Sequence, residues 1–304
     1  MFKLTLLFSF LITFGFQIFA QNNAPMLIGR VAINQDQIAF AYAGKIWLVP
    51  RSGGAARPLD AAAFDNNPVF SPDGTRLAFS RFNGGDYDVY VAPSDGKGEA
   101  KRLTFQAEDD FVTAWTADGR EIVFESTRDE ENVTRLHKIN ADGSSTLAES
   151  MPLPQAFQGS FSPDGNKIAY NPRTGFGEWR YYRGGSVAPI YINDLKTGAV
   201  EKLPNQNFND RNAMWLGDKI YFLSDRTGIF NLFVYDLKTK QARQLTKFDR
   251  QGIRTAAAAK DAIVFVQNGR LHLFDLATNQ DKIVNVSVSP DTSELRPRKV
   301  NAMR

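Results

Sequence analysis

Alternating apolar and polar residues recur along this chain in pairs of short runs joined by a tight turn. The clearest pair is FSPDGTRLAF at residues 70–79, which returns almost unchanged as FSPDGNKIAY at residues 161–170. In this phrase proline presets the first corner of the turn, aspartate bonds its own backbone and glycine takes the left-handed corner. Each copy therefore predicts a β-hairpin, and its return predicts a repeated unit.

The repeat is visible when the apolar residue that opens the second run of each hairpin is used as a register mark. Each mark begins an apolar triplet that ends in an aromatic residue. A third run follows, with an aromatic or imidazole side chain at a constant place, and most copies have a fourth, shorter run. The register marks are Ile38, Leu77, Ile122, Ile168, Ile220 and Ile263. The slot residues of the third run are Trp47, Tyr90, His137, Tyr191, Phe233 and His272.

Four strands in a unit of roughly 45 residues are typical of a β-propeller blade. One such sheet buries too little apolar surface to be stable alone, whereas radial stacking buries both faces of every blade. The sequence therefore predicts an all-β fold, a six-bladed β-propeller of four-stranded antiparallel blades over residues 27–288. A β-solenoid would need shorter repeats, and a sandwich would not keep one register through six units.

The two ends of the chain differ from the repeats. Residues 1–20 place Lys3 before an apolar run that ends near the small residue Ala20, which is typical of a secretory signal peptide. A membrane anchor is the alternative, although the run is short for a spanning helix. We therefore expect a periplasmic or secreted protein after cleavage near Ala20. Residues 289–304 are polar and interrupted by proline, which predicts a linker or the start of a truncated following domain.

Charge and cysteine content exclude several classes of protein. The formal net charge of +3 is small beside 36 basic and 33 acidic residues, and no basic stripe indicates a nucleic-acid partner. The chain has 0 cysteines. Disulfide staples and thiolate chemistry are therefore excluded, and stability must come from the core.

The connection between the second and third strands varies most in length, and in an antiparallel blade all of these connections lie on one face. Variable loops on a rigid scaffold commonly carry binding residues. The longest connection, residues 171–188, contains Trp179, Arg180, Tyr182 and Arg183, which could recognise carboxylates and stack on a ligand. The alternative is that its aromatic residues only pack the loop onto the neighbouring blade.

Arginines also follow the second strand in four blades, where they would surround the same mouth of the propeller. One interpretation is a ring that attracts the carboxylate of a peptide. The other is that each arginine pairs with a nearby acid such as Asp86, Glu130 or Asp225. The four arginines are Arg81, Arg128, Arg173 and Arg226.

No catalytic constellation accompanies these candidates. The chain has 2 histidines, and both occupy the aromatic slot of the third strand, which indicates packing. A general base must meet a nucleophile, and no G-x-S-x-G elbow, Gly-rich phosphate loop or H-E-x-x-H motif is present. The Asp-Gly pairs fit turn chemistry better than metal binding. We expect no catalytic residue, metal site or cofactor in this chain.

Three stretches resemble the amino-terminal propeller of bacterial tricorn-type proteases. They are the Ser-Pro-Asp-Gly hairpins, the segment WLGDKIYFLSDRTGIFNLF at residues 215–233 and the segment WRYYRGG at residues 179–185. The hairpins alone are shared with TolB-like propellers, so the other two segments carry the likeness.

The resemblance implies the non-catalytic module of a secreted serine protease that acts on oligopeptides. Such a module would gate or guide peptides to or from an active site outside this chain, and a second propeller, a PDZ module and catalytic domains would follow. The resemblance also implies that basic residues anchor the peptide's C-terminal carboxylate. The adjacent arginine pair that would mark them is absent, which leaves Arg128, Arg180 and Arg183 as candidates.

Two other functions stay open. The chain could be a self-contained TolB-like periplasmic propeller that binds proteins. It could instead belong to an esterase or prolyl-peptidase relative, in which a propeller filters access to a hydrolase domain. The sequence also leaves the oligomeric state open, a homo-oligomer included.

Overall fold

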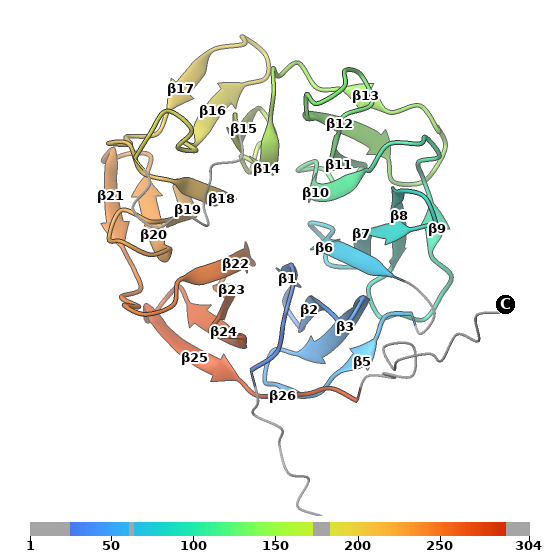
Figure 1. Ribbon diagram of the computed structural model, residues 1–304, viewed down its shortest axis with the longest axis horizontal. Coiled ribbons are helices and arrows are strands. Elements are labelled where there is room, and N and C mark those ends of the chain that lie inside the picture. Colours follow the sequence, from blue (N-terminus) through green and yellow to red (C-terminus); the bar gives the residue numbers. More distant parts are fainter. Residues whose placement is uncertain (1–24, 61–63, 173–182, 290–304) are drawn as a thin grey trace, which may run out of the picture.

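A computed structural model describes residues 25–60, 64–172 and 183–289 of the protein. Six four-stranded antiparallel sheets surround a central axis, and the strands of each sheet are consecutive in the chain apart from one short insertion (Figure 1). The predicted six-bladed propeller is confirmed. None of the described segments forms a helix of the length and hydrophobicity needed to cross a membrane.

Each blade begins with an inner strand and ends with an outer one. Blade 1 contains β1 (Val31–Ile33), β2 (Gln37–Tyr42), β3 (Lys45–Pro50) and β5 (Arg57–Pro58), and blade 2 contains β6 (Asp65–Phe70), β7 (Arg76–Phe82), β8 (Tyr87–Pro93) and β9 (Lys101–Arg102). Blade 3 contains β10 (Phe111–Trp115), β11 (Glu121–Ser126), β12 (Arg135–Asn140) and β13 (Glu149–Ser150), and blade 4 contains β14 (Phe157–Phe161), β15 (Lys167–Asn171), β16 (Tyr191–Asp194) and β17 (Val200–Lys202). Blade 5 contains β18 (Asp210–Leu216), β19 (Lys219–Ser224), β20 (Asn231–Asp236) and β21 (Gln241–Gln244), and blade 6 contains β22 (Ile253–Ala258), β23 (Ala262–Gln267), β24 (Arg270–Asp275) and β25 (Gln280–Val284).

The core follows the repeat that the sequence predicts. All six register marks are fully buried, and burial of an isoleucine or leucine side chain stabilises a fold by about 1.5–3 kcal/mol. The aromatic residue of each triplet lies directly opposite the slot residue of the third strand in every blade. These cross-strand pairs are Phe40–Trp47, Phe79–Tyr90, Phe124–His137, Tyr170–Tyr191, Phe222–Phe233 and Phe265–His272.

The Ser-Pro-Asp-Gly hairpin forms through a compact set of side-chain bonds. The Asp73 carboxylate accepts hydrogen bonds from the Thr75 amide at 3.0 Å and from the Ser71 hydroxyl at 2.5 Å. Gly74 has a φ of 74°, which an L side chain rarely adopts. The Gly74 carbonyl accepts a bond from Asn34 Nδ2 of blade 1 at 3.2 Å. The turn thus shapes its own blade and joins it to the preceding one.

The ring closes without exchange of a strand between the first and last blades. Instead, β26 (Val286–Ser287) runs parallel to β4 (Gly54–Ala55) in a separate two-stranded sheet at the edge of blade 1 (Figure 1). The Gly54 amide donates to the Asn285 carbonyl at 2.9 Å. We call the junction between blades 1 and 6 the seam. One hydrophobic cluster contains residues of both blades, so the seam is held mainly by apolar packing and only to a small extent by backbone hydrogen bonds.

Candidate functional site

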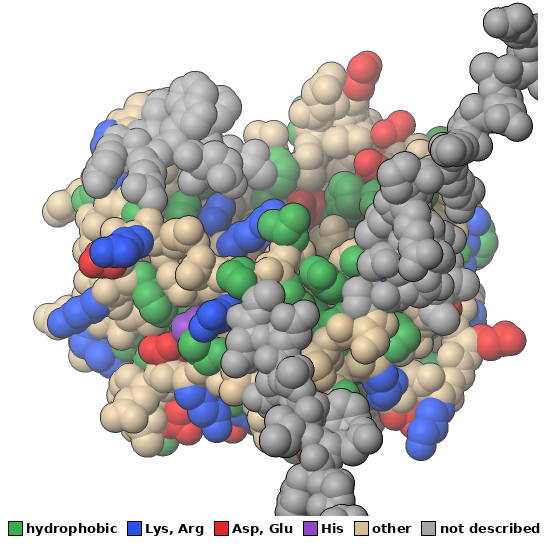
Figure 2. Space-filling model, turned by 60° about the horizontal axis from the view of Figure 1, so that its bottom comes forward, with side chains coloured by type: hydrophobic (Ala, Val, Ile, Leu, Met, Phe, Trp, Pro, Cys, Tyr) green, Lys and Arg blue, Asp and Glu red, His purple; other side chains and the backbone are tan. Residues whose placement is uncertain are grey.

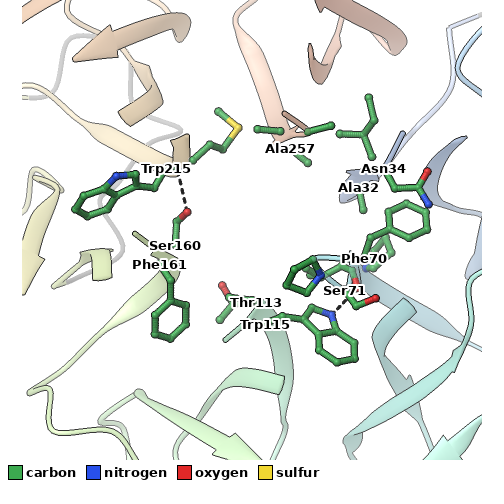
Figure 3. A pocket seen from close by; sticks show the side chains of 18 of the residues that line it. Ala32, Asn34, Phe70, Ser71, Thr113, Trp115, Ser160, Phe161, Trp215 and Ala257 are labelled. Carbon is green, nitrogen blue, oxygen red and sulfur yellow. Dashed lines mark hydrogen bonds between the residues drawn. The ribbon is translucent and has the colours of Figure 1, made fainter. Parts of the chain in front are cut away.

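The inner strands β1, β6, β10, β14, β18 and β22 surround a central channel of about 1020 Å³. Small side chains line much of it, and the close view shows them around an open centre (Figure 3). Examples are Ala32, Thr113, Ser160 and Ala257. Because these side chains are short, backbone groups and water can reach a ligand from several blades at once.

The hairpin turns form one end of this channel. Ser71 to Thr75 of blade 2 line it, as do Ser162 and Pro163 of blade 4. Two tryptophans of the inner strands, Trp115 and Trp215, lie near these turns. Each donates a hydrogen bond to the inner strand of a neighbouring blade. Trp115 Nε1 donates to the Val69 carbonyl at 2.9 Å, and the Trp215 amide donates to Ser160 Oγ at 2.9 Å (Figure 3).

A set of side-chain amides lines the channel farther from those turns. Asn67, Gln158 and Asn212 occupy irregular positions of β6, β14 and β18, with φ values of 51°, 52° and 58°. The left-handed conformation is accessible to asparagine more readily than to most residues. Their side chains bond the next blade: Asn67 Nδ2 to the Val112 carbonyl at 3.2 Å, and Gln158 Oε1 to the Asn212 amide at 2.9 Å. The amides therefore connect the inner strands.

Two charged side chains accompany these amides. Glu125 of β11 lines the channel, and its Oε1 accepts a bond from the Gln158 amide at 2.9 Å. Burial raises the pKa of Glu125, while that bond and the Arg30 charge act in the opposite direction. Arg30 also lines the channel and forms no ion pair with another residue of the described part of the chain. The channel thus offers a cation and an acid to a polar ligand.

The arginines that follow the second strands are engaged in ion pairs with buried aspartates. Arg81 Nε lies 2.8 Å from Asp65, Arg128 lies 2.5 Å from Asp110 and Arg226 lies 3.0 Å from Asp210. Each aspartate side chain is at most 1% exposed. Each arginine also lies over the aromatic residue of its own triplet, Phe79, Phe124 or Phe222. These contacts support the pairing interpretation, with partners other than those expected.

The long connection of blade 4 is described only at its end. Arg183 Nη1 lies 3.1 Å from Asp225 Oδ2, and the guanidinium stands over the ring of Phe208 at 4.8 Å. The other candidates of this region, Arg173, Trp179, Arg180 and Tyr182, lie outside the described residues. A binding role for them stays a prediction.

The two histidines pack as slot residues. His137 Nε2 lies 2.9 Å from Asp129 Oδ2, and its ring stacks on Phe124. His272 Nδ1 lies 2.8 Å from Asp281 Oδ2, and its ring stacks on Phe265. Within residues 25–60, 64–172 and 183–289, no three histidine, aspartate or glutamate side chains gather as metal ligands would.

The functional residues that sequence reasoning missed are those of the channel. Nothing in the sequence singled out Arg30, which immediately precedes β1, or Glu125, which lies within β11, because neither belongs to a recognisable motif. The amides had a signal in the sequence, because each stands three residues before an aromatic residue at or next to the end of the inner strand. These pairs are Asn67 with Phe70, Gln158 with Phe161 and Asn212 with Trp215.

Sequence comparison places the chain among known proteins. The chain is 30% identical to tricorn protease homolog 1 of Streptomyces coelicolor over 93% of its own length and 27% of that relative. It is 24% identical to the tricorn protease of Thermoplasma acidophilum, over 86% of this chain and 26% of the relative. The chain thus spans about a quarter of the length of the curated relatives it matches.

Solved structures show the same fold. The crystal structure of the tricorn protease superimposes with a TM-score of 0.75 at 23% identity, over 86% of this chain and 26% of that chain. TolB from Acinetobacter baumannii superimposes with a TM-score of 0.53 at 19% identity, over 71% of this chain and 53% of that chain. Residues 25–280 match the family described as the tricorn protease N-terminal beta propeller domain, and the chain belongs to this family.

Proposed function

We propose that this propeller guides oligopeptides through its central channel, to or from the active site of a secreted tricorn-type serine protease whose catalytic residues lie outside the chain. The observation that carries the proposal is the channel itself. It is about 1020 Å³ in volume, its inner wall is lined largely by short side chains, and the amides of Asn67, Gln158 and Asn212 hold its blades in place. An extended peptide can use such a wall because its own backbone supplies the hydrogen-bonding groups.

Arg30 gives the channel a fixed charge that a peptide can use. Its guanidinium lines the channel and has no ion-pair partner in the described part of the chain, in contrast to Arg81, Arg128 and Arg226. Arginine can bind a carboxylate through two parallel hydrogen bonds. We therefore assign the contact with an anionic group of the peptide to Arg30. Removing that contact should weaken binding about tenfold or more.

Cysteine labelling tests the channel directly, because the chain has 0 cysteines of its own. In Thr113→Cys the thiol stands on the channel wall, whereas in Ala277→Cys it stands on an exposed turn of blade 6. A neutral decapeptide of Gly, Ser, Ala and Asn should slow maleimide labelling of the first variant and leave the second unchanged. Arg30→Ala should reduce the protection.

Equal labelling rates with and without the peptide at Thr113→Cys would refute passage through the channel. A TolB-like protein-binding role is the alternative function. The likeness to TolB at 19% identity shows the fold alone, so it carries no weight for that alternative.

A further inference from the structure

We propose that one face of blades 2 and 3 is a docking surface for extended peptide segments that combine positive charge with large apolar side chains. The surface lies at the end of these blades where β7 connects to β8 and β11 connects to β12. This inference rests on the peptide-guiding function proposed above and names the class of peptide that the module would select.

Four aromatic residues lie near one another on this face, and together they are here called the aromatic row. Its members are Phe64, Phe82, Tyr87 and Phe111. The Phe82 amide donates to the Phe64 carbonyl at 2.9 Å, and Phe82 lies opposite Tyr87 in the β7–β8 ladder. The rings of Phe82 and Tyr87 are 5.4 Å apart, and those of Tyr87 and Phe111 are 5.2 Å apart. The row therefore runs from the start of blade 2 to the inner strand of blade 3.

Much of this aromatic surface is open to solvent. Phe64 is 53% exposed and Phe82 is 40% exposed. Phe105 follows β9 at the same end of blade 2 and is 57% exposed, with Arg102 over its ring at 4.6 Å. These are the three exposed phenylalanines among the residues that the structure describes. Aromatic rings gathered on one face, rather than scattered singly, mark an interaction surface.

The aromatic row leads to the channel. Phe111 of β10 lies directly opposite Glu125 in the β10–β11 ladder. Glu125 lines the channel and bonds the Gln158 amide of blade 4. A peptide that lies along the row therefore reaches the channel wall at Glu125 without leaving the protein surface.

The charge of this face is negative because its arginines are already neutralised. Arg81 and Arg128 pair with the buried aspartates described above, and Arg102 lies 2.6 Å from the buried Asp88. Four acids of the same face have no ion-pair partner in the described part of the chain: Asp86, Glu108, Asp109 and Glu131. In Figure 2 a group of acidic side chains projects at the upper right, the side on which blades 2 and 3 lie in Figure 1.

These two features select the same ligand. Exposed aromatic rings bind apolar side chains and also attract lysine or arginine through their faces. Uncompensated acids raise the local concentration of cations and repel anionic peptides. A segment with lysine or arginine beside phenylalanine or leucine satisfies both, whereas an acidic segment of equal hydrophobicity does not.

Fluorescence polarisation with three labelled decapeptides tests the proposal on the 304-residue chain. The first peptide contains Lys and Phe, the second Glu and Phe, and the third Lys and Ser. The Lys/Phe peptide should bind at least about tenfold more tightly than the other two in about 50 mM salt, and its advantage over the Glu/Phe peptide should shrink in about 0.5 M salt because surface charges are screened.

Two double variants locate the surface. Phe82→Ser with Phe105→Ser, and Glu108→Lys with Glu131→Lys, should each weaken binding of the Lys/Phe peptide by about tenfold. The matched controls are Ile283→Ser, a 44% exposed residue of blade 6, and Glu99→Lys, an exposed acid near the opposite end of blade 2. Both controls should bind as the unaltered chain does, and thermal melts verify that all variants fold.

Equal affinity for the Lys/Phe and Glu/Phe peptides, or equal losses in variants and controls, would overturn the docking surface. Its failure is separable from failure of the channel function. If the neutral decapeptide protects Thr113→Cys but no charge preference is found, only the docking surface is refuted. If the Lys/Phe preference maps to blades 2 and 3 but Thr113→Cys is never protected, the channel function is refuted and the surface stands alone.

Discussion

Replacing Arg226 by methionine should strongly destabilise the propeller, because it removes the charge partner of a buried carboxylate. The Asp210 side chain is 0% exposed, and Arg226 Nη2 lies 3.0 Å from both of its oxygens. After the replacement only neutral donors such as Asn205 Nδ2, at 2.6 Å, would face that carboxylate. Breaking a buried pair by removing one partner costs about 3–5 kcal/mol. For a domain of this size that corresponds to a fall in Tm of about 5–9 °C.

Chemical denaturation and thermal melts measure this effect. The control is Arg51→Met, because the Arg51–Asp261 pair has the same type of contact at 2.8 Å while the Asp261 side chain is 63% exposed. An exposed pair contributes only about 0–1 kcal/mol, so the control should change the unfolding free energy little. A loss in Arg226→Met no larger than that of Arg51→Met would refute the assignment of Arg226 as a structural residue.

The pH dependence of the same variant supplies a second check. Burial raises the pKa of Asp210 above its ordinary value, and Arg226 opposes that rise. Without Arg226 the pKa should rise further, so the folded variant would bind a proton more readily than the unfolded chain does. Its deficit in stability should therefore shrink as the pH falls toward the raised pKa. A deficit that is constant between pH 8 and pH 5 would contradict this account.

Three further predictions concern the turns, the seam and the slot. Hydrogen bonds lower the pKa of Asp73 and of Asp164 from 3.8 to about 2. The stability that these carboxylates contribute is therefore complete above the pKa of the unfolded chain and is lost as the pH falls toward about 2. Replacing both by Asn should make the free energy of unfolding less dependent on pH in that range. Gly53 has a φ of 90° and lies against the backbone of Asn285, just before β26. Gly53→Ala should therefore lower the free energy of unfolding, measured by chemical denaturation, by more than about 1 kcal/mol. The loss should be larger than that of Gly198→Ala, where the added methyl group would have open space. The purified chain should hydrolyse no oligopeptide in a fluorogenic assay, and turnover abolished by His137→Ala would contradict its role as a packing residue.

The repeat was predictable because strands two and three of each blade carry strong local signals. The register marks and slot residues combine apolar alternation with turn chemistry, and the structure confirms both sets at every blade. Pairing of the arginines was one of the two interpretations of the sequence, but their actual partners were missed for a physical reason. Each ion pair joins the start of the inner strand to the end of the second, as in Asp65 with Arg81 and Asp210 with Arg226, so the partners meet only when the hairpin is formed.

The channel was harder to predict, because its residues are set by how blades meet rather than by how each blade folds. The left-handed conformations of Asn67 and Gln158 depend on irregular strand pairing that no local sequence rule specifies. No sequence pattern indicated how the ring closes, because β26 and β4 pair through only two residues each. The hairpin turns line one end of the channel, a position that their turn chemistry alone does not indicate.

The short pairing of β26 with β4 has a consequence for how the protein folds. Every blade is built from strands that are neighbours in the chain, so each can form through local contacts at a modest entropic cost. The seam alone brings the first and last blades together across almost the whole described sequence. We therefore expect an open arc of native-like blades to form first, with closure of the seam as the late step. In native-state hydrogen exchange, the Gly54 and Ala56 amides should then lose protection before those of the central strands.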